Sequence, residues 1–233
     1  MQVRAIKTRV FKEGESLADF VASHLKRVPE GSVLVITSKI VALAEGRTAV
    51  ASTAAKKATL IRSESVSAIK TKWVWLTIKD GLVMPNAGID ESNADGKIIL
   101  LPADSFKAAA AIRRALMKRF KVKKFGVLIT DSRVLPLRAG VTGVALGYAG
   151  FKGLRDYRGK KDIFDRPLRM TQTNVADGLA ASAVFLMGEG AEQQPLALVT
   201  DAPVAFSDLV KKEELMIALK DDLYRPLFRK AGL

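Results

Sequence analysis

Three short apolar runs constrain the fold of this chain more than any other feature. They are "SVLVITS" at 32–38, "KFGVLIT" at 124–130 and "PLALVT" at 195–200. Runs of this length and composition are typical of strands that are buried on both faces. Because both faces of such a sheet must be covered by helices, the runs predict a fold in which strands and helices alternate.

Helical spacing appears between the apolar runs. One helix is predicted in "ESLADFVASHLKRV", with Ser16 as its N-cap and an apolar face formed by Leu17, Phe20, Val21 and Leu25. His24 lies on or beside that face, so we interpret it as a core or boundary residue. Further helices are expected over about 105–120 and over 174–187.

A hairpin is predicted in "WVWLTIKDGLVMP", because the glycine of "KDG" supplies the positive φ of a tight turn. Its tryptophans, Trp73 and Trp75, alternate with Val74 and Leu76, so we expect both to pack on one face. Residues 50–70 are predicted to form a helix and an exposed connection.

No repeat, linker or low-complexity segment divides the 233 residues. We therefore expect one α+β module over residues 1–233, with mixed sheets and packed helices in two intimately associated subdomains. Residues 207–233 are predicted to form a C-terminal helix and tail.

Composition limits the chemistry of any site. Cys is absent and His24 is the only histidine, which excludes disulfides, thiolates and zinc motifs with several histidines. Any bound metal must therefore use oxygen ligands. No apolar run reaches the roughly 18 residues that cross a bilayer, and no signal peptide is recognisable. We expect a cytoplasmic protein with no membrane contact.

The chain is strongly basic, with a formal net charge of +14. Such a surface attracts nucleic acid, nucleotides or acidic metabolites. The densest basic run, "KRFKVKKF" at 118–125, resembles a nucleic-acid patch. It also fits the last turn of a helix, where cations are favoured, and we prefer that interpretation.

Negative charge is concentrated in one turn, "NAGIDESNADG" at 86–96. Asp90 follows one predicted strand and Asp131 ends another, so adjacent strands can bring both carboxylates to one edge of a sheet. Glu189, between two glycines at a helix end, is a third candidate. With the Ser132 hydroxyl, these oxygens suit Mg²⁺ or Mn²⁺. Each residue also has an ordinary alternative as a turn, cap or solvated loop residue.

The common nucleotide-binding signatures are missing. No GxxxxGK[ST] motif is present, and "GEGAEQ" has Gln193 where a GxGxxG motif needs its third glycine. If a nucleotide binds, metal ions held by oxygen ligands must neutralise its phosphates.

Several motifs together resemble the coenzyme F420-0:γ-glutamyl ligase family, in order and over nearly the whole chain to about residue 206. They are "ITSKIVALAEGR" (36–47), "NAGIDESN" (86–93), "ITDSR" (129–133), "RAGVTGVALGYAGFKGLRDYRGKKD" (138–162), "VAD" (175–177) and "LMGEG" (186–190).

The resemblance implies a reaction, its cofactors and an assembly. Members use GTP and a divalent metal to join L-glutamate to a carboxylate of coenzyme F420-0 by an amide bond, through an acyl phosphate. It implies Mg²⁺ or Mn²⁺, as two ions, with K⁺ as a further candidate. It also implies an intertwined homodimer whose site lies near the interface, and only the ligase module is expected here.

The resemblance also implies roles for single residues. Asp90, Asp131 and Glu189 resemble metal ligands, and Ser132 stands where the family usually has Thr. The implied nucleotide contacts are Arg9, Val10, Phe11, Ser38, Lys39, Asn93, Met187, Gly188, Glu189 and Gly190.

Three anions must meet in such a reaction, so cations are needed to offset their repulsion. The basic residues of the glycine-rich segment could clamp carboxylates. They are Arg138, Lys152, Arg155, Arg158 and Lys160. Lys39, Arg138, Lys152 and Arg155 are the candidates for a catalytic role.

The sequence departs from the motifs of the family at two places, which affect the expected nucleotide and acceptor sites. Leu43 stands where many members have Lys, and Lys39 is the candidate to compensate. The segment "SRVLPLR" (132–138) replaces a smaller, glycine-containing version. Relatives that act on folate perform the same chemistry, so folate stays an alternative acceptor.

A rival function of another class is a basic nucleic-acid-binding protein. It predicts salt-dependent oligonucleotide binding that survives Asp90→Asn. We favour the ligase, with no nucleic-acid partner.

Overall fold

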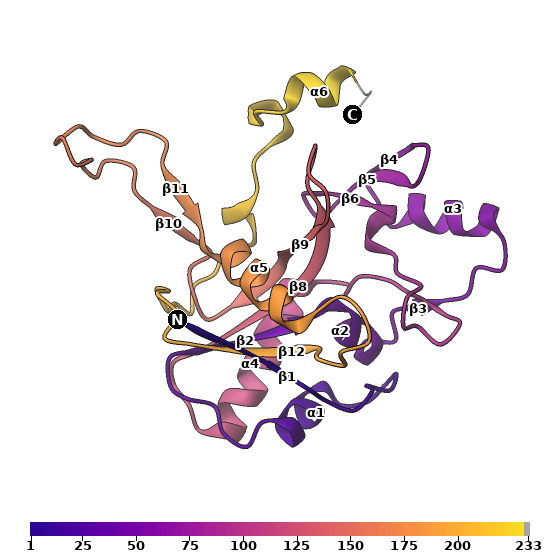
Figure 1. Ribbon diagram of the computed structural model, residues 1–233, viewed down its shortest axis with the longest axis horizontal. Helices are drawn as coiled ribbons and strands as arrows, with labels where there is room; N and C mark the ends of the chain where they lie inside the picture. The colour runs from indigo at the N-terminus through magenta and orange to yellow at the C-terminus, as the bar shows by residue number, and fades with distance from the viewer. Residues whose placement is uncertain (231–233) are drawn as a thin grey trace.

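A five-stranded mixed sheet forms the centre of the computed structural model, which describes residues 1–230 (Figure 1). Its strands, in spatial order, are β1 (Gln2–Ile6), β12 (Leu196–Thr200), β2 (Ser32–Thr37), β8 (Phe125–Val134) and β9 (Val141–Ala149). β2 and β8 are parallel, and all other neighbours are antiparallel. The three apolar runs are therefore the three central strands, as their composition predicted.

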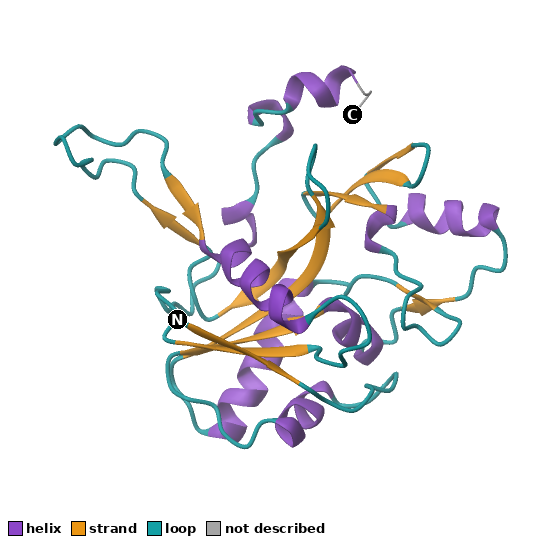
Figure 2. Cartoon of the chain, in the orientation of Figure 1, coloured by secondary structure: helices purple, strands orange, loops and turns teal. Residues whose placement is uncertain are grey.

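The two faces of the sheet are covered by different helices (Figure 2). Side chains of successive strand residues point to opposite faces, so each central strand contributes to two cores. Leu34 of β2 packs with α1 (Leu17–His24) and α4 (Ser105–Phe120). Val35, next along the chain, packs with α5 (Val175–Met187) on the other face.

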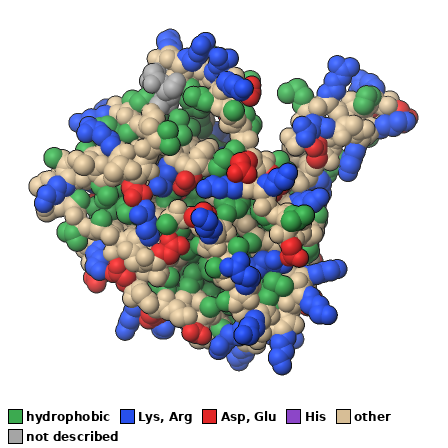
Figure 3. Space-filling view, turned by 180° about the vertical axis from the view of Figure 1, so that it is seen from behind, with side chains coloured by type: hydrophobic (Ala, Val, Ile, Leu, Met, Phe, Trp, Pro, Cys, Tyr) green, Lys and Arg blue, Asp and Glu red, His purple; other side chains and the backbone are tan. Residues whose placement is uncertain are grey.

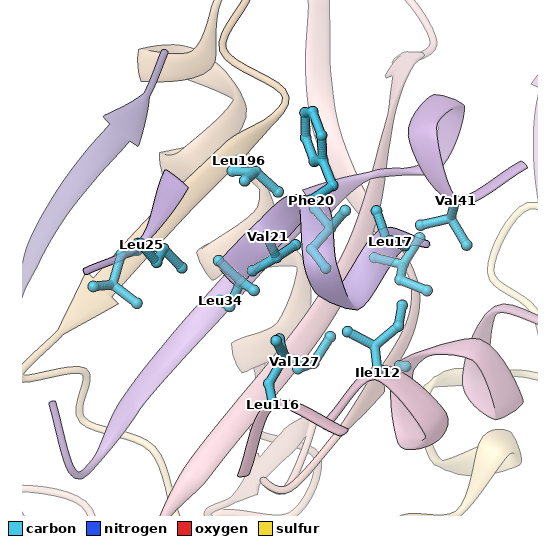
Figure 4. Close-up of a cluster of buried hydrophobic side chains, with 14 of the residues drawn as sticks. Leu17, Phe20, Val21, Leu25, Leu34, Val41, Ile112, Leu116, Val127 and Leu196 are labelled. Atoms are coloured by element: carbon cyan, nitrogen blue, oxygen red, sulfur yellow. The ribbon is translucent and has the colours of Figure 1, made fainter. Parts of the chain in front are cut away.

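The first of these cores is the more extensive (Figure 4). In Figure 4, Phe20 and Val21 of α1 lie above Leu34 of the sheet, and Leu116 of α4 lies below it. All four side chains are nearly inaccessible to solvent. Burying an apolar side chain of this size contributes roughly 1.5–3 kcal/mol, so this core fixes α1 and α4 against the sheet.

The predicted starts of three helices are confirmed by their caps, although α1 ends at His24, earlier than predicted. The Ser16 hydroxyl accepts a hydrogen bond from the Asp19 N–H, as predicted, and the Asp104 and Asn174 side chains cap α4 and α5 in the same way. α4 ends where Lys121 adopts a φ of +55°. The basic run at 118–125 is thus the last turn of α4 and its link to β8, as we preferred.

Smaller elements occupy the segment between β2 and β8. They are α2 (Ser38–Ala44), β3 (Thr48–Ala49), α3 (Ala54–Ser63), β4 (Ser67–Lys70), β5 (Trp75–Lys79), β6 (Leu82–Pro85), the 3-10 helix η1 (Asn86–Gly88) and β7 (Ile98–Ile99). β4, β5 and β6 form one antiparallel sheet, and β3 pairs with β7. The β5–β6 hairpin is confirmed, whereas β4 was missed within a region predicted as a helix and connection.

The prediction for the tryptophans is wrong for Trp73. It precedes β5 and is 82% exposed, with the Lys72 ammonium over its ring. Trp75 lies within β5, half-buried, with the Arg62 guanidinium over its ring. The alternation in the sequence begins before the strand does, so it does not place both rings on one packed face.

Two segments project from the body of the molecule (Figure 1). One is the arm formed by β10 (Leu154–Asp156), β11 (Gln172–Asn174) and the loop between them. The other is the C-terminal segment with η2 (Lys212–Leu215), η3 (Leu219–Asp221) and α6 (Arg225–Lys230). The mixed α and β content confirms the predicted fold class. No helix of residues 1–230 is long and apolar enough to cross a membrane.

Candidate active site

One cavity of about 420 Å³ gathers most of the predicted site residues. It lies at the end of the sheet where β1 and β2 finish and β12 begins, because Thr8, Thr37 and Pro195 all line it. In sheets with parallel strands, ligands bind beyond the carboxyl ends of those strands. The cavity has that position relative to β2 and β8.

Five stretches of the chain bring the predicted residues to this cavity. The lining includes Arg9, Val10, Phe11, Lys39, Asp90, Asn93, Asp131, Ser132, Met187, Gly188, Glu189 and Gly190. Ser38 does not line it, but its hydroxyl hydrogen-bonds the Asp131 carboxylate. The predicted metal ligands and nucleotide contacts therefore form one site.

A left-handed turn positions Asp90. Asn86, Ala87 and Gly88 all have φ between +51° and +71°, a conformation that costs energy for residues with a Cβ. The Thr77 hydroxyl accepts a hydrogen bond from the Ala87 N–H at 2.8 Å and holds the turn in place. A side chain at Gly88 would meet Leu101 at 2.6 Å, so glycine is required there. The backbone that leads into the acidic stretch is therefore fixed by hydrogen bonding and packing.

The Asp90 carboxylate is held in its charged form. The Lys39 ammonium lies 2.8 Å from it, and the Ser92 N–H donates a hydrogen bond to it at 2.6 Å. Burial favours the neutral acid, but these contacts outweigh burial and lower the pKa of Asp90. Lys39 also donates to the Ser92 carbonyl at 2.9 Å, so it fixes the shape of the acidic turn.

Asp131 has the opposite electrostatic character. Burial raises its pKa to about 7, and the nearby Asp90 charge adds to the rise. Hydrogen bonds from the Ser132 N–H and the Ser38 hydroxyl oppose the rise without cancelling it. Two carboxylates that repel each other in a cavity are stabilised when a cation joins them.

The position of Asp131 differs from the prediction that it ends a strand. β8 continues to Val134, and it is the parallel pairing with β2 that stops, at Thr37 and Thr130. Asp131 is thus the first residue of β8 beyond that pairing. The β8–β9 ladder changes register between Ile129 and Thr130, and such bulges redirect side chains.

The loop after α5 closes the cavity on another side. Gly188 ends the helix with a φ of +80°. Glu189 then accepts a hydrogen bond from the Ser132 hydroxyl at 2.5 Å, and the Asn93 amide lies 3.5 Å from the Gly190 carbonyl oxygen. β8, the acidic turn and this loop are therefore joined by direct polar contacts.

The cavity has a local excess of negative charge. Four carboxylates line it, from Asp90, Asp131, Glu189 and Glu192, whereas Arg9 and Lys39 are the cations among its described lining. No group of three His, Cys, Asp or Glu side chains within residues 1–230 is arranged as a complete metal site. The available donors are hard oxygens, and Mg²⁺ and Mn²⁺ accept such partial sets because water and phosphate complete their coordination. The residues present therefore fit a divalent cation that is shared with a phosphate ligand.

Other predicted residues lie outside the cavity in the single chain. Arg138 is in the β8–β9 connection and Lys152 follows β9, where its N–H donates to the Ala205 carbonyl. Arg155 is at the base of the arm and donates to the Pro203 carbonyl. Their assignment as cationic clamps stays a prediction, and so does that of Arg158 and Lys160, which belong to the same arm.

Some residues that line the cavity were not predicted from the sequence. Thr8, Glu192, Gln193, Gln194 and Pro195 line the cavity, and the Thr8 N–H donates to the Gln193 carbonyl at 2.9 Å. The sequence held one indication of their role: Thr8 follows the first strand, and residues 192–195 come directly before β12. That signal becomes useful only once β1 and β12 are known to be neighbours.

Known proteins of one family are similar to this chain in sequence. The family model for F420-0:Gamma-glutamyl ligase matches residues 5–201. Coenzyme F420:L-glutamate ligase of Archaeoglobus fulgidus is 33% identical over 239 residues, which cover 95% of this chain and 94% of that protein. The protein of the same name from Methanocaldococcus jannaschii is 30% identical over 245 residues, 97% of each chain.

A shorter alignment has higher identity. The Methanococcus maripaludis (strain C7) protein, also named coenzyme F420:L-glutamate ligase, is 42% identical over 147 residues. That alignment covers 63% of this chain and 58% of the relative, less than two thirds of its length. The family model and the two long alignments together show that this chain belongs to the F420-0:gamma-glutamyl ligase family.

Proposed function

We propose that the chain is a nucleotide- and divalent-metal-dependent γ-glutamyl ligase. In this proposal it joins the amine of L-glutamate to a carboxylate of coenzyme F420-0, with GTP as the phosphoryl donor. This acceptor is proposed because the relatives are named coenzyme F420:L-glutamate ligases. Folate is the second acceptor to test, because its terminal carboxylate is chemically equivalent.

One observation carries the proposal. Asp90, Asp131, Ser132 and Glu189 come from three separate segments, yet they line one cavity together with Arg9 and Lys39. Oxygen donors of this kind would hold Mg²⁺ or Mn²⁺ against nucleotide phosphates. When bound, the metal would neutralise charge on the transferred phosphoryl group.

The chain's own residues have defined tasks in the proposed reaction. An oxygen of the acceptor carboxylate attacks the γ-phosphorus, the nucleoside diphosphate leaves, and an acyl phosphate forms. The glutamate amine then attacks the acyl carbon, loses a proton and expels phosphate, which gives the amide. Lys39, 23% exposed and fixed by Asp90, is placed to stabilise anionic oxygens. Asn93 and the 188–190 loop would orient the nucleotide.

A homodimer is part of the proposal. Its support is a set of exposed apolar side chains on the projecting arm, Ile163, Phe164 and Met170. A second copy of the chain that covers these side chains would also bring the basic residues of the arm close to the surface of that copy. Light scattering coupled to size exclusion should give about twice the chain mass, and a monomer at all concentrations would contradict this part.

The test of the function is product analysis. Purified protein is incubated with L-glutamate, Mn²⁺ or Mg²⁺, GTP or ATP, and either F420-0 or folate, and products are read by mass spectrometry. We expect the mass of one added glutamyl unit on F420-0, in equal amount to the nucleoside diphosphate formed. Addition only to folate would replace the acceptor and keep the mechanism.

Two controls separate the proposal from polyanion binding. Omission of metal should abolish product, because Lys39 and Arg9 alone leave the phosphates under-neutralised. Oligonucleotide binding that survives Asp90→Asn, with no product from any acceptor, would favour the nucleic-acid-binding function instead.

A further inference from the structure

A second cavity, of about 500 Å³, lies at the opposite end of the same strands. Gln2 begins β1, Thr200 ends β12, and Pro29 precedes β2, and all three line it. Its floor is formed by Gln2, Arg4, Leu198 and Thr200, which are cross-strand partners in the β1–β12 ladder. α1 ends at His24, and His24, Lys26, Arg27 and Pro29 form the opposite side of the cavity.

The walls of this cavity are basic. Arg4, His24, Lys26 and Arg27 line it, and no Asp or Glu does so among residues 1–230. Within that part of the chain, no ion pair joins Arg4, Lys26 or Arg27 to a carboxylate. This contrasts with the active-site cavity, where Lys39 is paired with Asp90.

Unpaired cations that converge on one cavity repel each other, and a bound anion relieves that repulsion. Lys and Arg side chains also gather along the lower edge of the molecule, with fewer Asp and Glu among them, at the edge where α1 and α4 lie (Figure 3). Two of the three unpaired cations are arginines, whose planar groups bind phosphate or carboxylate through two hydrogen bonds.

We propose that the cavity lined by Arg4, Lys26 and Arg27 is a binding site for a small polyanion with adjacent charges, such as a diphosphate or a polycarboxylate. A volume of about 500 Å³ exceeds the needs of a single phosphate ion. Among residues 1–230 no Phe, Tyr or Trp lines it, and the ring of His24, which does, already packs against Phe20. The ligand is therefore recognised by its charges, and this site is separate from the one proposed for the nucleotide.

His24 connects the two cavities. It lines the basic cavity, and its Nε2 lies 3.4 Å from the Arg9 backbone nitrogen, while Arg9 lines the active-site cavity. Its Nδ1 lies 2.8 Å from the Phe20 carbonyl oxygen, so the ring is fixed at the end of α1. As the only histidine of the chain, it gives a single set of imidazole signals by NMR.

The test is a titration with inorganic pyrophosphate in buffer freed of divalent metal by a chelating resin, because EDTA is itself a polycarboxylate. Without divalent metal the active-site cavity lacks the charge to hold phosphates, whereas the basic cavity needs no metal. We expect saturable binding of one pyrophosphate per chain by calorimetry, with a matching shift of the His24 imidazole signals. Tricarballylate, run in parallel, distinguishes a polycarboxylate ligand from a phosphate ligand.

Paired variants localise the binding. Arg4→Gln/Arg27→Gln should weaken pyrophosphate binding at least ten-fold. Arg114→Gln/Arg169→Gln removes the same charge from exposed positions outside the cavity and should leave binding within two-fold. Circular dichroism checks that both variants are folded.

Three results would overturn the proposal. The first is the absence of saturable binding of either probe at low salt. The second is equal weakening of pyrophosphate binding in both double variants. The third is tighter binding of a single-stranded 12-mer oligonucleotide than of pyrophosphate, through Arg4 and Arg27. None of them bears on the ligase, because the titration is done without divalent metal and the product assay is done separately.

Discussion

Strands β1, β12 and β2 connect two cavities of opposite charge. At one end, four carboxylates and two cations line the active-site cavity. At the other, the lining holds Arg4, Lys26, Arg27 and His24, with no carboxylate from residues 1–230. The net charge of +14 describes neither end. Local charge, and not the total, decides which ligand each end can hold.

The two ends also differ in how they are built. The acidic end needs a left-handed turn at 86–88, a bulge near Ile129 and a positive φ at Gly188. The floor of the basic end consists of ordinary paired strand residues. Strain of this kind persists where the surrounding structure fixes it and is commonly found at active sites. We infer that the acidic end requires precise geometry and that the basic end requires only charge.

The largest expected effect is the loss of turnover in Asp131→Asn. An amide cannot replace the negative charge that the proposed metal requires, so we expect a decrease in kcat/KM of roughly 10³-fold, about 4 kcal/mol. Asp95→Asn is the matched control, because Asp95 is exposed in the same acidic turn and does not line the cavity. Equal activity in the two variants would show that the Asp131 carboxylate of the active-site cavity has no specific role in turnover.

The sequence predicts much of this site because its residues follow buried strands. Asp131 and Lys39 come directly after apolar runs, and those runs had to become central strands. The 193–195 segment was not found, because its place depends on the pairing of β1 with β12 across most of the chain. The prediction that Trp73 packs on a strand face was wrong for a related reason, because alternation alone does not set where a strand begins.

Next in size is the stability effect of Gly88→Ala. The new side chain would have a φ of +71° and would meet Leu101 at 2.6 Å. Strain and overpacking together should lower the free energy of unfolding by roughly 2–4 kcal/mol. Gly96→Ala is the control, since its φ is +76° with open space around it, and it should cost about 1 kcal/mol. Urea unfolding measures both, and equal losses would contradict the packing argument.

A smaller effect concerns pH. The pKa of Asp131 is raised to about 7 in the folded chain, so the folded state binds a proton more tightly than the unfolded state does. The free energy of unfolding should therefore fall as pH rises from about 4 through 7. The full shift corresponds to about 4 kcal/mol, and the half-buried position reduces the expected change to about 1–2 kcal/mol.

Asp131→Asn should remove this pH dependence. In EDTA at pH 8 the variant should melt at a higher temperature than the wild type, by a few degrees. At pH 4 the two should coincide more closely, because Asp131 is then protonated. A variant that melts lower at pH 8 would show that the Asp131 charge stabilises the metal-free fold.

The smallest effect is expected at the basic end. Arg4→Gln/Arg27→Gln should change kcat and KM by less than two-fold when no polyanion besides the substrates is present, because neither side chain lines the active-site cavity. A large loss of activity would show that the two ends are not independent even without a ligand. Steady-state kinetics at fixed ionic strength provides the measurement.

The most direct measurement is Mn²⁺ binding by electron paramagnetic resonance, which detects the free ion. Wild type and Asp95→Asn are titrated with Mn²⁺ in the presence of GDP, alongside Asp131→Asn. We predict saturable binding in the first two and at least ten-fold weaker binding in Asp131→Asn. Equal Mn²⁺ affinity in all three would contradict the claim that the acidic end of the sheet holds the metal.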